Sequence, residues 1–144
     1  MMRVNGFSAT QSSFDDVLIL PYEKRQKSRQ RVALESGIEA GLTLPRGTVL
    51  RGGDYLLSDD GKVIAVKAEL EKTSRVASDD PLLLQRAAYH LGNRHVPLAV
   101  TEAGLRYLQD YVLDELVVQL GLTVVHEDAP FEPEHGAYGG GHHH

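Results

Sequence analysis

Residues 78–92 decide the fold class, and they read Ser78-Asp79-Asp80-Pro81-Leu82-Leu83-Leu84-Gln85-Arg86-Ala87-Ala88-Tyr89-His90-Leu91-Gly92. Asp80 can accept hydrogen bonds from the free backbone N–H groups at a helix start, and Pro81 fits the first helical position, where no donor is needed. Apolar side chains then recur at helical spacing at Leu83, Leu84, Ala87, Ala88 and Leu91. The pattern predicts a helix from about residue 80 to 91, ended by Gly92 in a left-handed conformation.

A second helix and four extended segments surround this stretch. The helix is predicted from a second apolar repeat that ends before Gly121, at Val112, Leu113, Leu116, Val117 and Leu120. The extended segments are residues 72–77, 96–101, 105–108 and 122–126. The order is β-α-β-β-α-β, which is that of ferredoxin-like domains. Because the helices of such a domain cover one face of its sheet, we expect a partner subunit or the N-terminal domain to cover the other face.

The first half of the chain has the pattern of an all-β domain. Short apolar runs at residues 17–20, 32–34 and 42–44 each precede a turn signal, and Asp60-Gly61 predicts a hairpin between residues 55–57 and 63–66. Arg51-Gly52-Gly53-Asp54 is interpreted as a tight structural bend, because it lacks the lysine and the following helix of a phosphate loop. We predict an α+β protein with an all-β domain at residues 1–74, a ferredoxin-like domain at 75–131 and a flexible tail at 132–144. The proline, glycine and charge content predicts mobility from just beyond residue 126.

Composition excludes several classes of protein. The chain has 144 residues, 42% hydrophobic and 24% charged, as in folded soluble domains. Its net charge of −5 argues against a general nucleic-acid binder, and the lack of a long apolar run or secretory signal predicts a cytoplasmic protein with no membrane contact. One basic run stands out and is interpreted as a solvated strand face in preference to an anion or partner patch: Lys24, Arg25, Lys27, Arg29 and Arg31.

Histidine is the best clue to chemistry. All 7 histidines lie within residues 90–144, and the chain has no cysteine, so a divalent metal would be held by imidazole in the second half. His90 and His95 are five residues apart, too far around a helix to chelate one ion together, and His90 is expected to be packed and hydrogen-bonded. His95 follows the helix stop and can project, so a copy of it across a twofold axis would make a two-imidazole site. His126 and His135 carry no prediction.

The three terminal histidines, His142, His143 and His144, have two interpretations. After a glycine-rich spacer they fit the remnant of a purification tag, which would have no biological meaning. They also fit a native metal-collecting tail, because flexible imidazoles can join a site formed elsewhere.

At these residues the chain resembles the UreE family of urease accessory proteins, which are nickel metallochaperones. The resemblance rests on several motifs in a fixed order: Ala40-Gly41-Leu42-Thr43-Leu44-Pro45-Arg46-Gly47, Leu50-Arg51-Gly52-Gly53-Asp54, Ala88-Tyr89-His90-Leu91-Gly92-Asn93-Arg94-His95-Val96-Pro97, Leu105-Arg106-Tyr107 and Pro130-Phe131-Glu132-Pro133-Glu134. It implies an N-terminal domain that engages protein partners and a C-terminal domain that dimerises, with His95 as the central ligand at the dimer interface.

The resemblance also implies a function and partners. The function is delivery of Ni(II) to the maturing urease active site, without enzymatic activity. The partners are a second copy of the chain, the urease apoprotein and the urease accessory GTPase complex, and Zn(II) or Cu(II) are alternative ions in vitro. Gly136-Ala137-Tyr138 before the terminal histidines matches the family and favours the native tail. Gln109 and Tyr111 stand where some relatives carry histidines of a peripheral site, so we expect fewer ions per dimer here.

Other classes of function remain as alternatives. A zinc hydrolase would need about three protein ligands and a general base, and the sequence has no His-Glu-x-x-His or equivalent spacing. A non-enzymatic interaction module and a general Zn or Cu binding protein both fit the composition. The ordered set of motifs favours the nickel chaperone.

Overall fold

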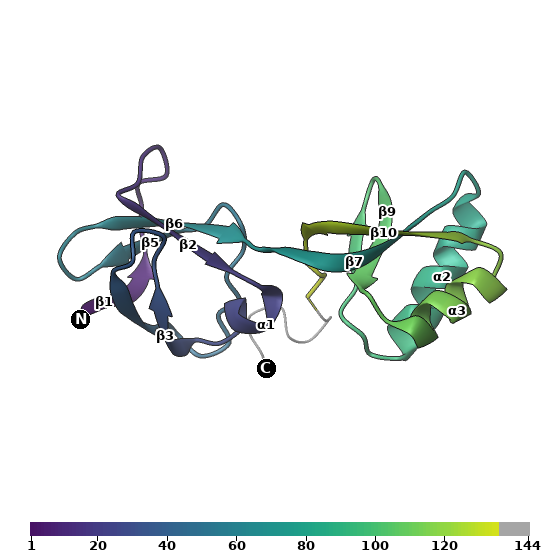
Figure 1. Ribbon diagram of the computed structural model, residues 1–144, viewed down its shortest axis with the longest axis horizontal. Helices are drawn as coiled ribbons and strands as arrows, with labels where there is room; N and C mark the ends of the chain where they lie inside the picture. The colour runs from purple at the N-terminus through teal and green to yellow at the C-terminus, as the bar shows by residue number, and fades with distance from the viewer. Residues whose placement is uncertain (136–144) are drawn as a thin grey trace. The chain divides into compact units, whose positions relative to one another are not determined.

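The computed structural model describes residues 1–135, which form two compact units (Figure 1). The division falls between Glu69 and Leu70, so that the first unit comprises residues 1–69 with His135 and the second residues 70–134. The predicted boundary after residue 74 falls within a strand that begins at Leu70. Within the described residues, no helix is long and apolar enough to cross a membrane.

The first unit is built on one six-stranded sheet. Its elements are β1 (Met2–Phe7), β2 (Asp16–Leu20), α1 (Tyr22–Arg25), β3 (Arg29–Ala33), β4 (Glu39–Thr43), β5 (Tyr55–Ser58) and β6 (Val63–Ala68). The strand order is β2-β6-β5-β1-β4-β3, in which β1 pairs parallel with β4 and β2 pairs parallel with β6. Apart from the single turn of α1, the predicted all-β character is confirmed. Strand β1 was not predicted, because only Val4 in it is buried and its neighbours are distant in sequence.

Two turns of this unit follow the predicted chemistry. Gly61 has a φ of 84°, and Ser58 N–H donates to the Lys62 carbonyl at 2.9 Å, which closes the β5–β6 hairpin. In the second bend, the Asp54 carboxylate accepts from Arg51 N–H at 2.7 Å. The two ends of the sheet also approach each other, since Glu35 N–H donates to the Val17 carbonyl at 2.8 Å. The core is formed by inward-facing aliphatic side chains: Val4, Leu18, Leu20, Val32, Leu34, Leu42, Leu44, Leu50, Leu56, Ile64 and Val66.

Arg25 corrects the interpretation of the basic run. It is fully buried at the end of α1, where its guanidinium donates to the carbonyls of Leu20 (3.0 Å) and Leu50 (3.1 Å). A buried charge is tolerated only where such hydrogen bonds replace its hydration. This residue is therefore part of the core and not of a solvated strand face.

The second unit has a four-stranded antiparallel sheet with two helices on one face (Figure 1). Its elements are β7 (Leu70–Ala77), α2 (Pro81–Asn93), β8 (Ala99–Thr101), β9 (Gly104–Leu108), α3 (Tyr111–Gln119) and β10 (Thr123–Pro130), with strand order β10-β7-β9-β8. The helices pack on the sheet through a core of buried side chains: Val76, Ala87, Leu91, Leu98, Leu105, Tyr107, Leu113, Val117 and Leu122.

The start of α2 agrees with the prediction, but its end does not. Asp80 accepts from Leu82 N–H at 2.9 Å and precedes Pro81, as predicted, while Asp110 caps α3 in the same way. Gly92 stays within α2, which runs to Asn93, so the prediction that Gly92 ends the helix is wrong. The chain leaves the helix two residues later, where His95 N–H donates to the Gly92 carbonyl at 3.0 Å.

The segment after residue 126 is also ordered. Strand β10 pairs with β7 from Thr123↔Ala77 to Pro130↔Leu70, and the Phe131 side chain is fully buried. Glu134 N–H then donates to the Leu98 carbonyl at 2.8 Å. The predicted mobility is therefore wrong for residues up to 134. Its composition is unfavourable for a strand, but backbone pairing along the whole of β7 compensates.

Candidate metal centre

His95 lies directly beyond the end of α2 with its side chain exposed to solvent. Its φ of 58° makes it the sole non-glycine residue with positive φ among residues 1–135. Histidine tolerates this left-handed region better than most residues, although the conformation still costs free energy relative to glycine. The backbone therefore fixes where the imidazole leaves the chain, whereas its ring is hydrogen-bonded to none of the described residues.

The position of His95 also suits a cation electrostatically. The C-terminal end of a helix carries a partial negative charge from its unpaired carbonyl groups. His95 and the cap residue Arg94 follow the last turn of α2 directly. A metal ion on this imidazole would lie close to that negative end.

A shallow cavity of about 180 Å³ lies beside the segment that follows His95. It is lined by Val96 and Pro97 on one side and by residues 108–110 on the other. In that second segment, the Gln109 amide donates to the Thr73 carbonyl at 3.2 Å, and Asp110 accepts from the first N–H groups of α3. The Gln109 and Asp110 side chains thus serve the fold, while Tyr111 is exposed.

The other histidines lie in different surroundings. His90 is exposed in the last turn of α2 and contacts the ring of Tyr89 edge-on, so the prediction of a packed, hydrogen-bonded His90 is wrong. Its position is outside the apolar stripe that faces the sheet. His135 Nε2 lies 3.0 Å from the Arg51 guanidinium. His142, His143 and His144, predicted as metal ligands, are outside the described residues.

His126 belongs to a polar network centred on Asp114, which the sequence analysis did not find. Its Nε2 lies 2.7 Å from one oxygen of the Asp114 carboxylate, whose other oxygen accepts from Tyr107 (2.6 Å) and Ser74 (2.8 Å). Partial burial opposes ionisation of Asp114, but the three hydrogen bonds outweigh it and lower its pKa. Burial, with Asp114 beside it, raises the pKa of Tyr107 well above its usual value. The network ties α3 to three strands of the sheet.

The sheet face opposite the helices carries a charged cluster. Glu127 Oε1 accepts from Arg75 at 2.7 Å and from Arg106 at 2.9 Å, and Arg106 also donates to the Thr73 hydroxyl at 2.6 Å. These hydrogen bonds lower the pKa of Glu127. The centre of this face is therefore polar, and its cover by a partner subunit or the N-terminal domain stays a prediction.

Exposed apolar side chains lie on both helices, as well as at Leu70 and Val100 on the strands. They include Leu82 and Tyr89 on α2 and Tyr111, Val112 and Val118 on α3, each more than half exposed. Among residues 1–135, no set of three or more His, Asp or Glu side chains converges to hold a metal ion. In the described part of one chain, His95 is thus an exposed imidazole at the end of α2 that belongs to no group of three or more potential ligands.

Comparison with known proteins gives a consistent match over both units. Residues 6–69 match the family model described as UreE urease accessory protein, N-terminal domain, and residues 71–144 match the corresponding C-terminal domain. The chain is 54% identical over 127 residues to a urease accessory protein UreE of Ralstonia nicotianae, covering 88% of this chain but 60% of that protein. It is 56% identical over 126 residues to the protein of that name from Alkalilimnicola ehrlichii (88% and 77% covered), and 55% identical over 123 residues to that from Proteus mirabilis (85% and 76%).

Proposed function

Because the chain belongs to the UreE family of urease accessory proteins, we propose that it is a nickel-binding chaperone that delivers Ni(II) during maturation of the urease active site. The observation that carries the proposal is the exposed imidazole of His95, held in a left-handed turn at the end of α2. Nickel is the cargo in this proposal, and the protein is not an enzyme.

The metal would be held between two copies of the chain. A single exposed imidazole binds a divalent ion weakly, but a twofold axis near His95 brings a second imidazole without any further sequence. The exposed apolar side chains of α2 and α3 supply the kind of surface that a homodimer buries. His142, His143 and His144 would complete the coordination shell together with water. The β-α-β-β-α-β order and the strand order β10-β7-β9-β8 support a ferredoxin-like classification for this unit.

A site of this kind allows both capture and release. Exchange of the ion with a partner is favoured because the site has few fixed ligands, is exposed to solvent and takes additional ligands from outside the fixed turn. We propose the urease apoprotein and the urease accessory GTPase complex as those partners, engaged in the cytoplasm. Cu(II) is expected to bind at least as tightly as Ni(II) in vitro by the usual stability order, and Zn(II) to compete.

Calorimetric titration of Ni(II) into the purified, untagged protein tests the proposal, with His95→Ala and the matched variant His90→Ala. Both histidines are exposed near the end of α2, but only His95 occupies the turn. We expect His95→Ala to lose the high-affinity site and His90→Ala to keep it. Sedimentation with and without Ni(II) reports the dimer. Equal nickel affinity in wild type and His95→Ala would refute the interface site. Absence of nickel binding by the wild-type protein would refute the proposed function and favour the alternative of a protein-interaction module.

A further inference from the structure

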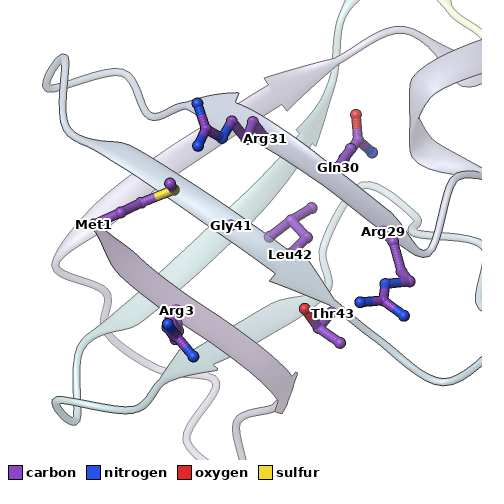
Figure 2. Close-up of a pocket in the computed structure, with 8 residues that line it drawn as sticks. All are labelled: Met1, Arg3, Arg29, Gln30, Arg31, Gly41, Leu42 and Thr43. Carbon is purple, nitrogen blue, oxygen red and sulfur yellow. The ribbon is translucent and has the colours of Figure 1, made fainter.

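A basic groove crosses the outer surface of three strands in the first unit (Figure 2). It has a volume of about 390 Å³ and is lined by Arg3 on β1, by Arg29 and Arg31 on β3, and by Gly41 and Thr43 on β4 between them. Figure 2 shows the arginines on the two flanking strands and the small residues on the central strand. The groove therefore has a low floor and basic walls.

Strand register explains this shape. Arg3 pairs with Gly41, and Gly41 pairs with Arg31, so the three residues form one row across the sheet. The row places the Cα atoms of Arg3 and Arg31 about 10 Å apart, two strand spacings, with a glycine on the strand between them. The Met1 side chain also lines the groove beside this glycine. Arg29 lies opposite Thr43, about 7 Å further along β3.

The three arginines are available for binding. Their side chains are exposed, and none of the three guanidinium groups donates a hydrogen bond to, or forms an ion pair with, another residue in the range 1–135. Three arginines elsewhere are committed to partners, Arg25 to backbone carbonyls and Arg75 and Arg106 to Glu127, whereas Arg46, Arg86 and Arg94 are exposed like those of the groove. An exposed cluster of one sign without internal partners attracts a ligand of the opposite sign.

We propose that this groove binds an extended acidic segment of a partner protein, with its carboxylates between Arg3, Arg29 and Arg31. Arginine binds carboxylates through paired N–H donors, which favours this chemistry. Successive carboxylates of an extended chain can each meet a different arginine along this spread. A nucleic acid, with a phosphate at every nucleotide, would bring many more negative charges against a protein of net charge −5 than a short acidic segment does. The inference deepens the partner-binding part of the proposed function and rests on it.

Fluorescence anisotropy with a short labelled peptide of alternating glutamate and threonine tests the groove on the full chain. The glutamine-for-glutamate peptide is the ligand control. Arg31→Glu is expected to weaken binding of the acidic peptide roughly five- to tenfold, since it replaces an attraction by a repulsion. Arg86→Glu, an exposed residue on α2 with the same change of charge, is the matched control and should alter it less than twofold.

A second variant separates shape from charge. Gly41→Val fills the floor without altering charge, and a side chain fits there because an added Cβ would meet only Met1 Sδ at 3.5 Å and Met2 O at 4.0 Å. It should weaken binding at least as much as Arg31→Glu, with an unchanged circular dichroism spectrum. Unaltered peptide affinity in both variants would overturn the proposal, as would equal binding of inorganic phosphate, a single-stranded oligonucleotide or the glutamine peptide. Nickel titration of the same variants keeps the two proposals distinguishable, because groove variants should retain the His95 site.

Discussion

Replacement of His95 by glycine should separate metal binding from stability. His95 holds a φ of 58°, a conformation that glycine adopts without strain and alanine does not. Its side chain is exposed and has no hydrogen-bond partner among the described residues, so removal of the ring itself costs little stability. We therefore expect His95→Gly and His95→Ala to lose the same imidazole but to differ in backbone strain.

The magnitudes follow from this difference. Left-handed backbone costs an L-residue ~1–2 kcal/mol, and glycine raises the entropy of the unfolded chain by ~0.4–1 kcal/mol. His95→Gly should thus raise the free energy of unfolding by up to ~1 kcal/mol, whereas His95→Ala should stay within ~0.5 kcal/mol of wild type. Both should weaken nickel binding by more than about a hundredfold, since loss of even an outer-shell partner of a metal ligand costs ~10–100-fold.

Urea unfolding of the metal-free protein, followed by circular dichroism, measures the first effect, and calorimetric nickel titration measures the second. A glycine variant that is less stable than the alanine variant would refute the strain argument. Retention of tight nickel binding by either variant would refute the assignment of His95. Because the two readouts depend on different properties of the same residue, one can fail without the other.

Three further predictions concern the second unit. Gly104→Ala should destabilise it by ~3 kcal/mol or more in thermal unfolding, because an added Cβ would lie 2.0 Å from the Val76 carbonyl oxygen and φ is 117°. The control Gly121→Ala has a φ of 97° but open space around the added Cβ, so it should cost only ~1 kcal/mol. Equal losses of stability in the two variants would contradict the predicted clash at Gly104. Because the pKa of Asp114 is lowered in the folded protein, its contribution to stability is complete above the unfolded pKa near ~4 and is lost as the pH falls through the folded pKa. Asp114→Asn should therefore flatten the acid limb of a plot of unfolding free energy against pH. An unchanged acid limb would argue against the network. Nickel affinity should fall below about pH 6, since protons compete with the ion for imidazole, and a pH-independent affinity would indicate carboxylate ligands instead.

Local chemistry was readable from the sequence, and non-local pairing was not. The start of α2 at Asp80 with Pro81 and the β5–β6 hairpin depend on a few adjacent residues, and the structure agrees there. Strand β10 pairs with β7, more than forty residues earlier, so composition alone predicted a mobile tail. The end of α2 was misplaced because a glycine permits a helix stop without requiring one.

The site shows the same distinction. Sequence placed His95 beyond a helix end and the structure gives it an exposed turn, but its ligand role stays a prediction. The Asp114 network could not be foreseen, because Ser74, Tyr107 and His126 come from three strands whose register brings them to one carboxylate. A protonated His126 and an ionised Asp114 would carry opposite charges. This pairing could be predicted from the sequence only after both residues had been assigned to neighbouring elements.

The two proposed sites divide the work of a metal chaperone between the two units. In the first site, His95 on its fixed turn determines where the nickel ion is held. The other ligands of the ion come from outside that turn and can be exchanged. The arginine groove lies in the other unit and uses a different interaction, ion pairing with carboxylates, which weakens with salt. Nickel binding through imidazole should be far less sensitive to ionic strength. A salt titration that releases the acidic peptide yet leaves nickel bound would show that partner recognition and metal retention are separable, and parallel loss of both would mean that a single surface serves them.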